Sequence, residues 1–194
     1  TAGGIIVQAK EILLSPAASP ETFFTVGNIT IGIDFHWQRQ QEQSFRGALL
    51  LTACSDDTLN LINLIPLEDY LASVISSEMS ADAPLEFLKA QAITARSWLL
   101  AMLAKKQTRR AGQIRSEQEI AVWQDVNDHE GFDVCADDHC QRYQGITRII
   151  SENVARAIDA TRGVFLVSGE DVCDARYYKC CGGRTETFAT AWEN

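Results

Sequence analysis

Two neighbouring stretches decide the fold of this 194-residue chain: PLEDYLASVISSEM at residues 66–79 and PLEFLKAQAITARSWLLAML at residues 84–103. Each begins with a proline, which suits the first turn of a helix, followed by acidic residues that the helix dipole favours there. In the second stretch, apolar residues recur at spacings of three and four, as in a helix with one buried face. The sequence therefore predicts a first helix that ends near Met79 and a longer second helix that reaches the basic run at residues 105–110.

The segment before these helices has the pattern of β-strands. Short β-branched or alternating apolar runs bounded by turn residues are typical of strands. Four such runs occur, at residues 4–9, 28–34, 47–53 and 58–65. The polar, glutamine-rich residues 36–43 predict a loop or a hairpin tip.

The segment after the helices is mixed. Residues 111–146 are polar and carry no clear apolar period, which predicts an irregular segment held by something other than its own core. Ser151 can cap a short third helix that ends at Gly163. A strand at 164–167, a returning strand at 171–179 and a glycine loop at 181–186 follow. We therefore expect an α+β fold in one domain, residues 1–194: a β-rich N-terminal part, two core helices, a C-terminal β-hairpin and a glycine loop.

Charge and hydropathy exclude several kinds of partner. The chain has 17 basic and 26 acidic residues and a net charge of −9, and nucleic acids and anionic lipids attract basic surfaces. No stretch approaches the ~20 apolar residues of a membrane-spanning helix. We expect no nucleic-acid partner and no transmembrane segment. Because the chain begins at Thr1 without a methionine or a leader pattern, we expect a fragment or a trimmed mature form.

Glu78 is the first candidate catalytic residue. It lies where the first helix is expected to end, so the helix dipole disfavours its negative charge, and its neighbours Ile75 and Met79 are apolar. Both conditions favour the protonated form that a general acid needs. From spacing alone, a solvated surface glutamate is the commoner explanation.

The two helical stretches resemble the signature of the stage II sporulation protein D (SpoIID) family, which includes the amidase-enhancer proteins. That signature is P-L-E-x-Y-L-x-x-V-x-x-x-E-M, then P-x-E-A-L-K-A-Q-A-x-A-A-R, and only Phe87 and Thr94 depart from its second half. Residues 160–164 and 182–186 are similar to the family's A-T-x-G-x and S-G-G-x-T-E segments. The resemblance runs from about Leu59 to the end of the chain, where the family's pattern continues. Residues 1–58 carry little of it.

The resemblance implies a lytic transglycosylase that cleaves the MurNAc–GlcNAc bond of peptidoglycan glycan strands, with peptide-free strands as the expected substrate. The family's catalytic acid maps onto Glu78, and the arginine that closes its second motif maps onto Arg96. Arg96 could bind a substrate carboxylate or N-acetyl oxygen, or form a structural ion pair instead. A glycoside hydrolase needs two carboxylates, whereas here one suffices because the sugar's own 6-hydroxyl attacks C1 and leaves a 1,6-anhydro end. No second carboxylate stands out near Glu78.

The glycine loop offers a candidate binding segment. An extended polysaccharide can approach a glycine backbone closely, tyrosine rings can stack on sugars, and cations can meet the lactyl carboxylates of muramic acid. We expect a catalytic groove between Glu78 and this loop, although a plain connection with tyrosines in the core explains the segment equally well. The run before the glycines also departs from the family's His/Ser/Thr-rich pattern. The candidate substrate-binding residues are Tyr178, Lys179, Gly182, Gly183 and Arg184.

A second cluster, His129, Cys135, His139 and Cys140, has the nitrogen and sulfur ligands of a tetrahedral zinc site. Some members of the resembled family carry a Cys/His zinc site in the same region. A filled Cys2His2 set leaves no open position, so the zinc would be structural and would brace a loop that lacks a core. A Cys135–Cys140 disulfide and uncoordinated side chains are the alternatives.

Three functions compete. The first is the lytic transglycosylase, and the second is a non-catalytic glycan-binding enhancer of a cell-wall amidase. The third, a zinc-dependent peptidoglycan hydrolase, needs an open metal site and a carboxylate base, and the H-E-x-x-H pattern is absent. The family's role implies an extracytoplasmic location, in the periplasm or cell envelope, and a cell-wall amidase as an expected partner.

Overall fold

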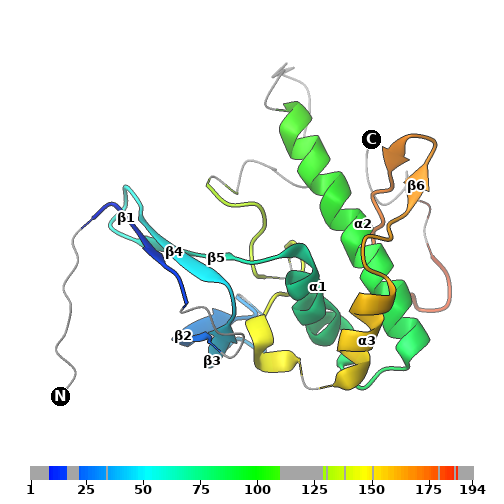
Figure 1. The fold of residues 1–194 in the computed structure, drawn as a ribbon, viewed down its shortest axis with the longest axis horizontal. Coiled ribbons are helices and arrows are strands. Elements are labelled where there is room, and N and C mark those ends of the chain that lie inside the picture. The colour runs from blue at the N-terminus through cyan, green and yellow to red at the C-terminus, as the bar shows by residue number, and fades with distance from the viewer. Residues whose placement is uncertain are drawn as a thin grey trace.

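The computed structural model describes residues 9–16, 22–33, 35–109, 129, 131–137, 139–149, 151–178, 180–185 and 187. Strands β1 (Glu11–Leu14), β2 (Phe24–Ile31), β3 (Arg39–Phe45), β4 (Ala48–Ala53) and β5 (Leu59–Leu64) come first (Figure 1). Helix α1 (Leu67–Ile75), the π-helical turn η1 (Ser76–Ser80) and helix α2 (Leu85–Arg109) follow. The 3-10 turn η3 (Gly145–Arg148), helix α3 (Glu152–Ala160) and the hairpin of β6 (Val167–Ser168) and β7 (Asp171–Val172) complete the order. The predicted α+β class is confirmed.

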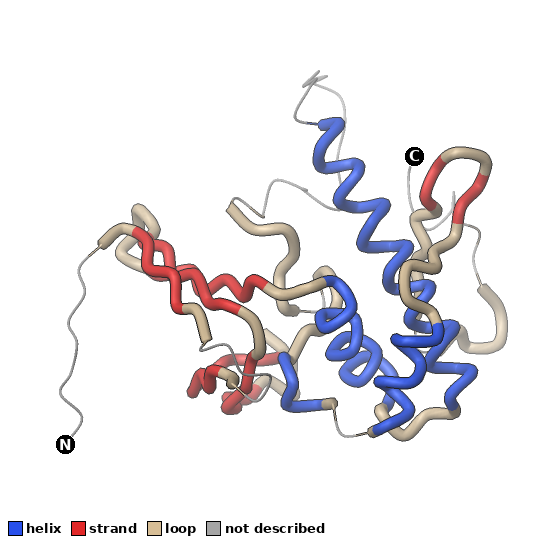
Figure 2. The backbone as a smooth tube through the Cα atoms, viewed as in Figure 1, coloured by secondary structure: helices blue, strands red, loops and turns tan. Residues whose placement is uncertain are grey.

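The N-terminal strands form two small antiparallel sheets. One has the order β1-β4-β5 and the other is the β2–β3 hairpin. The register of the hairpin shifts between Val26 and Ile29, where Asn28 has a left-handed backbone with φ of 58°. Figure 2 shows the strands at one end of the molecule and the three α-helices at the other, with β6–β7 beside α2.

Several strands differ from the sequence-based expectation. Strand β2 begins at Phe24 and not at residue 28, and the C-terminal strands, expected at 164–167 and 171–179, have only two residues each. Residues 36–43 were expected to form a loop or hairpin tip, but β3 begins at Arg39 and pairs with β2. Its sequence RQQEQSF shows no apolar alternation because only Gln43 and Phe45 are buried, while most of the strand faces solvent, as an antiparallel hairpin permits. The sequence also gave no indication of β1, and the strand expected at residues 4–9 lies largely outside the described residues.

The helices carry the core at the positions that the spacing predicts. Their buried apolar residues follow helical periods on α1, α2 and α3 and pack into one cluster with Phe45 and Leu49 of the strands. Ser151 caps α3, because its hydroxyl accepts a hydrogen bond from the Asn153 N–H. The buried helical residues are Tyr70, Leu71, Val74, Ile75, Leu88, Ala92, Ala95, Trp98, Leu99, Val154, Ala157 and Ile158.

A buried ion pair joins three segments of this core. The Arg96 side chain is 1% exposed, and its Nη2 and Nε donate to the Glu68 carboxylate at 2.5 and 3.2 Å. Its Nη1 donates to the Val164 carbonyl oxygen at 2.8 Å, and the Gly163 N–H donates to Glu68 at 3.4 Å. Helix α1, helix α2 and the turn after α3 therefore meet at this pair. Arg96 is a structural residue here, and its buried guanidinium does not fit the expected role of a substrate contact.

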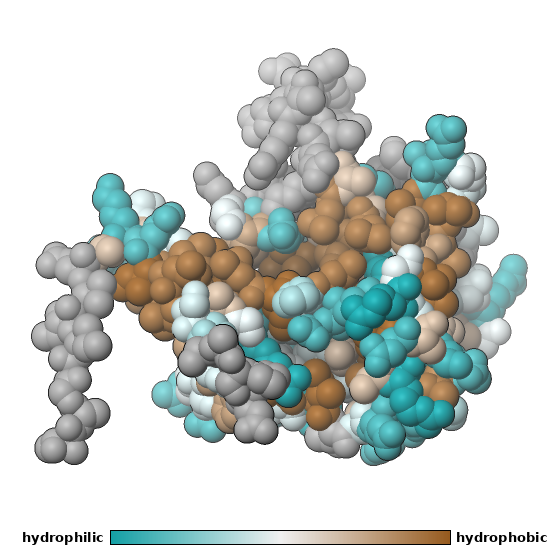
Figure 3. All heavy atoms as spheres, viewed as in Figure 1, coloured by the Kyte–Doolittle hydropathy of each residue, from teal (hydrophilic) through white to brown (hydrophobic). Residues whose placement is uncertain are grey.

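The surface of the described part also has an apolar area. Figure 3 shows apolar side chains over the β1–β4–β5 sheet, where Leu13, Leu59 and Leu61 are exposed. A cavity of about 910 Å³ opens between β5, α2 and residues 131–136, and apolar side chains form most of its wall. None of the described helices is both long and apolar enough to cross a membrane.

Because this ion pair is buried, removing one partner should strongly lower the stability of the fold. Glu68→Gln should lower the free energy of unfolding by about 3–5 kcal/mol, because it leaves the Arg96 charge buried and unpaired. The matched control is Glu86→Gln, which removes an exposed pair with Lys89 and should cost at most about 1 kcal/mol. Urea denaturation at neutral pH measures both, and equal losses would contradict the structural role of the pair.

Candidate functional site

Glu78 lies in the π-helical turn η1, which continues α1 beyond Ile75. Such turns are rare and frequently occur at functional sites. The Glu78 side chain is half-buried, and its Oε1 accepts a hydrogen bond from the backbone N–H of Arg142 at 2.8 Å. This bond fixes the carboxylate against a segment that is far away in the sequence. Glu78 is therefore not a freely solvated surface residue.

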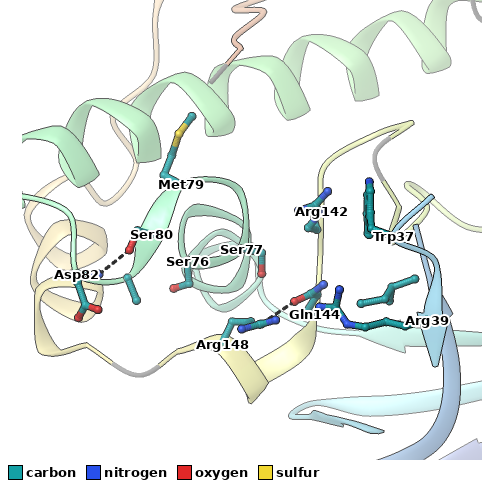
Figure 4. A pocket seen from close by; sticks show the side chains of 12 residues that line it. Trp37, Arg39, Ser76, Ser77, Met79, Ser80, Asp82, Arg142, Gln144 and Arg148 are labelled. Carbon is teal, nitrogen blue, oxygen red and sulfur yellow. Dashed lines mark hydrogen bonds between the residues drawn. The ribbon is translucent and has the colours of Figure 1, made fainter. Parts of the chain in front are cut away.

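A cavity of about 550 Å³ opens beside the η1 turn (Figure 4). Both chain neighbours of Glu78 line it, and so does Arg142, whose backbone N–H holds the Glu78 carboxylate, whereas Glu78 itself is not a lining residue. Three parts of the chain build the wall: the β2–β3 hairpin, the η1 turn with the residues after it, and residues 142–148. The lining residues are Ile31, Trp37, Arg39, Ser76, Ser77, Met79, Ser80, Ala81, Asp82, Arg142, Gln144 and Arg148.

Asp82 is a carboxylate that the sequence analysis did not single out. It is an exposed residue that lines the same cavity, and its backbone N–H is bonded to the Ser80 hydroxyl at 3.3 Å. Its only signal in the sequence was its position four residues after Glu78. A glycosidase mechanism with two carboxylates therefore has a candidate second group.

Tyr177 is one of two tyrosines, with Tyr70, that lie close enough to Glu78 to feel its charge. Its side chain packs against the core, burial raises the pKa of its hydroxyl, and the negative charge of Glu78 raises that pKa further. The hydroxyl is therefore protonated at neutral pH and can donate a hydrogen bond. Tyr178, which the sequence singled out, is instead 55% exposed.

The glycine loop is not joined to Glu78 by any hydrogen bond or ion pair among the described residues. Its described backbone bonds are internal: the N–H groups of Gly183 and Arg184 donate to Sγ and to the carbonyl oxygen of Cys181, each at 3.3 Å. Gly182 and Gly183 have left-handed backbones with φ of 62° and 98°, and Arg184 is exposed. Lys179 lies outside the described residues. Substrate binding by this loop stays a prediction.

The four residues of the expected metal site do come together. One donor atom from each of His129, Cys135, His139 and Cys140 lies within 4.8 Å of all the others. Nε2 of His129 lies 2.9 Å from Sγ of Cys140, and Nδ1 of His139 lies 3.7 and 3.9 Å from the two sulfurs. Both cysteines are thiols, not the alternative disulfide. The hydrogen bond from Cys140 lowers the pKa of Cys135 to about 5, which favours the thiolate, the form of cysteine that binds metals. This cluster could hold a metal ion.

The cluster is connected to Glu78 through two residues. Gln141, which follows Cys140, is 1% exposed and bonds to the Tyr70 hydroxyl and the Ala95 carbonyl oxygen, both at 3.1 Å. The next residue is Arg142, whose N–H holds the Glu78 carboxylate. A brace at Cys140 would therefore also fix the donor to Glu78.

Gly145 holds the hairpin wall of the cavity in place. Its backbone is left-handed, with φ of 58°, and a Cβ there would collide with the Ser44 carbonyl oxygen of β3. Beside this contact, the Ser44 N–H donates to the Thr147 hydroxyl at 2.9 Å. Only glycine allows β3 and η3 to approach this closely.

The comparison with known proteins agrees with this architecture. A family model for stage II sporulation protein, SpoIID, matches residues 55–167, more than half of the chain. An uncharacterised protein of Brachyspira hyodysenteriae is 29% identical over 132 residues, which cover 68% of this chain and 30% of the relative. The chain thus spans about 30% of the length of that curated relative. Glu78, Arg96 and the metal cluster lie inside the matched region.

The protein therefore belongs to a class of α+β proteins with a helix-end glutamate at a cavity and a Cys/His cluster nearby. More specifically, the chain is a member of the SpoIID family. This membership is consistent with a cell-wall-related role, since the family is linked to peptidoglycan processing.

Because β3 and η3 approach each other closely at Gly145, a larger residue there should destabilise the protein. Gly145→Ala should lower the free energy of unfolding by more than the about 1–2 kcal/mol of a left-handed alanine, because the Cβ also displaces β3. The control Gly169→Ala has nearly the same backbone, with φ of 62°, but its Cβ would meet open space. Chemical denaturation measures both variants, and the same loss at both positions would argue against the close approach.

Proposed function

We propose that this chain is a peptidoglycan lytic transglycosylase with Glu78 as its general acid and base. The observation that carries the proposal is the Glu78 carboxylate of a SpoIID domain, which the Arg142 N–H fixes and whose chain neighbours and Arg142 line a cavity. Peptide-free glycan strands are the proposed substrate. The proposed location is extracytoplasmic, in the periplasm or cell envelope, where this substrate lies, and a cell-wall amidase is the proposed partner.

The reaction needs one proton-transfer group. Protonated Glu78 gives its proton to the glycosidic oxygen, and the bond from C1 of the muramic residue to that oxygen breaks. The 6-hydroxyl oxygen of the same residue then bonds to C1, and the Glu78 carboxylate takes the hydroxyl proton. Glu78 returns to its starting state, and the products are a 1,6-anhydro end and a free 4-hydroxyl. Tyr177, as a protonated donor near Glu78, can stabilise the carboxylate between the two steps.

A hydrolase is the second candidate, because Asp82 lines the cavity that the chain neighbours of Glu78 also line. In that mechanism Glu78 would act as the acid and Asp82 as the base or nucleophile, and the product would have a hydrated reducing end. A glycan-binding enhancer of an amidase would use the same cavity without cleavage. A zinc hydrolase fits less well, since four protein donors fill a tetrahedral metal.

We propose that the Cys/His cluster holds a structural zinc. Tetrahedral zinc bonds of ~2.3 Å to sulfur and ~2.0 Å to nitrogen place the two kinds of ligand roughly 3.6 Å apart. The separations between His139 Nδ1 and the sulfurs, 3.7 and 3.9 Å, are close to this value, whereas His129 Nε2 lies nearer to Cys140 Sγ, at 2.9 Å. When bound, the metal would crosslink residues 129–140 and so support the Arg142 N–H that holds Glu78.

The proposal predicts that Glu78→Gln abolishes turnover. Glutamine keeps the shape of the side chain but cannot transfer a proton, and positioned acid–base catalysis contributes about 10²–10⁴-fold per step. Cleavage of peptide-free strands should fall below detection while strand binding and the folded state persist. The exposed glutamate variant Glu86→Gln should keep full activity. Wild-type cleavage by Glu78→Gln would overturn the assignment.

Product analysis separates the two catalytic candidates. The lytic transglycosylase yields only 1,6-anhydro-muramic ends by mass spectrometry, and Asp82→Asn changes their rate little. The hydrolase yields hydrated reducing ends and loses activity in Asp82→Asn. Intact strands after long incubation would instead favour the amidase-enhancer function.

The zinc proposal predicts about one zinc per chain. Cys140→Ser should lose the metal, lower the melting temperature and reduce glycan cleavage, because Cys140 is two residues from Arg142. Cys54→Ser, at a cysteine outside the cluster, should retain both metal and stability. Elemental analysis and thermal denaturation measure these effects. A metal-free protein with a mapped Cys135–Cys140 disulfide would contradict the proposal.

A further inference from the structure

Three arginines line the cavity beside Glu78, and the proposed mechanism uses none of their side chains. Arg39, Arg142 and Arg148 line this cavity together with one carboxylate, that of Asp82 (Figure 4). The protein as a whole has a net charge of −9, so this cavity is locally positive in an acidic molecule. A concave surface of one sign concentrates the field and attracts ligands of opposite charge.

Aromatic packing gives the Arg142 guanidinium a fixed position. The Cζ atom of this guanidinium lies 5.0 Å from the centroid of the Trp37 ring, within the range of a cation–π contact. Trp37 is itself stacked on Phe35, with centroids 5.5 Å apart, and Gly32 has no Cβ where the Trp37 ring lies. The ring is therefore held from two sides.

The other arginines keep donors for a ligand. Arg148 uses its Nε to donate to the Gln144 side-chain oxygen at 3.0 Å, and no described carboxylate forms an ion pair with Arg148 or Arg39. The Ser77 hydroxyl is also buried at this cavity and has no hydrogen-bond partner in the described part of the chain. Guanidinium groups offer paired N–H donors that match the two oxygens of a carboxylate.

We infer that Arg39, Arg142, Arg148 and Trp37 form a carboxylate-binding subsite for the glycan strand next to Glu78. The inference rests on the proposed function, because it takes the ligand to be peptidoglycan. Arg142 links the subsite to the catalytic group: its side chain lines the cavity, and its backbone N–H holds the Glu78 carboxylate.

The subsite depends on residues outside the family domain. Trp37 and Arg39 belong to the β2–β3 hairpin and precede the matched region, residues 55–167. The hairpin thus adds a recognition wall to the SpoIID domain of this protein. The carboxylate can come from the lactyl group of a muramic residue without a stem peptide, or from a stem peptide itself.

The test measures binding in Glu78→Gln protein, so that its outcome does not depend on cleavage. Three preparations of fluorescently labelled strands serve as ligands: peptide-free strands, the same strands with their lactyl carboxylates converted to amides, and strands that retain stem peptides. The test variant adds R39Q and R148Q. The control adds R156Q, which removes an exposed arginine on α3 outside the cavity lining.

The R39Q/R148Q change should weaken binding of peptide-free strands by about ten- to hundredfold, the effect of losing charged hydrogen bonds, and R156Q should have little effect. Amidated strands should bind weakly, and with equal affinity, to the Glu78→Gln protein and to the variant that adds R39Q and R148Q. If the arginines matter only for strands with stem peptides, the peptide supplies the carboxylate. If amidated strands bind as tightly as free-acid strands, or if R156Q weakens binding as much, the subsite is wrong. Arginine-dependent binding without any cleavage by the wild-type protein would overturn the transglycosylase proposal alone.

Discussion

The ion pair between Arg96 and Glu68 fixes the helices on which the candidate site is built. Burying a guanidinium is costly unless it is paired and fully hydrogen-bonded, and here carboxylate and carbonyl oxygens satisfy it. Its partners belong to α1 and to the turn after α3, and Arg96 itself belongs to α2. Three segments of the family signature, residues 66–68, 95–96 and 160–164, therefore meet at one interaction. Part of that signature thus preserves the arrangement of the helices, and α1 then ends where Glu78 is needed.

The site itself is assembled by contacts between distant segments. One irregular stretch, residues 140–144, connects the Cys/His cluster, the core and the cavity: Cys140 belongs to the cluster, Gln141 bonds to Tyr70 and Ala95, and Arg142 holds Glu78. Gly145 then lets the β2–β3 hairpin approach and close the cavity wall. Order at Glu78 therefore depends on a loop with little core of its own, for which a bound metal is a suitable brace.

The local sequence pattern was enough to predict the helices and two sets of candidate site residues, Glu78 and the Cys/His cluster. The period of the apolar residues placed α1 and α2, the cap at Ser151 and the stop at Gly163 placed α3, and the family signature pointed to Glu78. The short spacing of His129, Cys135, His139 and Cys140 was sufficient to suggest a cluster, because ligands within one loop need no long-range contact to meet. The polar strand β3 was missed because it buries few side chains, and a strand without an apolar face has the composition of a loop.

The sequence by itself determined the α+β class, the family, the helix end at Glu78 and the Cys/His ligand set. Only the tertiary structure decided that Arg96 is buried in an ion pair, that Tyr177 lies near Glu78 and Tyr178 is exposed, and that Asp82 and three arginines share the cavity. The physical reason is the range of the interactions. Helix periodicity and ligand spacing are properties of neighbouring residues, whereas a charge acquires its role from the groups that folding brings to it. The sequence does not distinguish a buried arginine from one that lines a cavity. The groups that surround the side chain after folding decide which role it has.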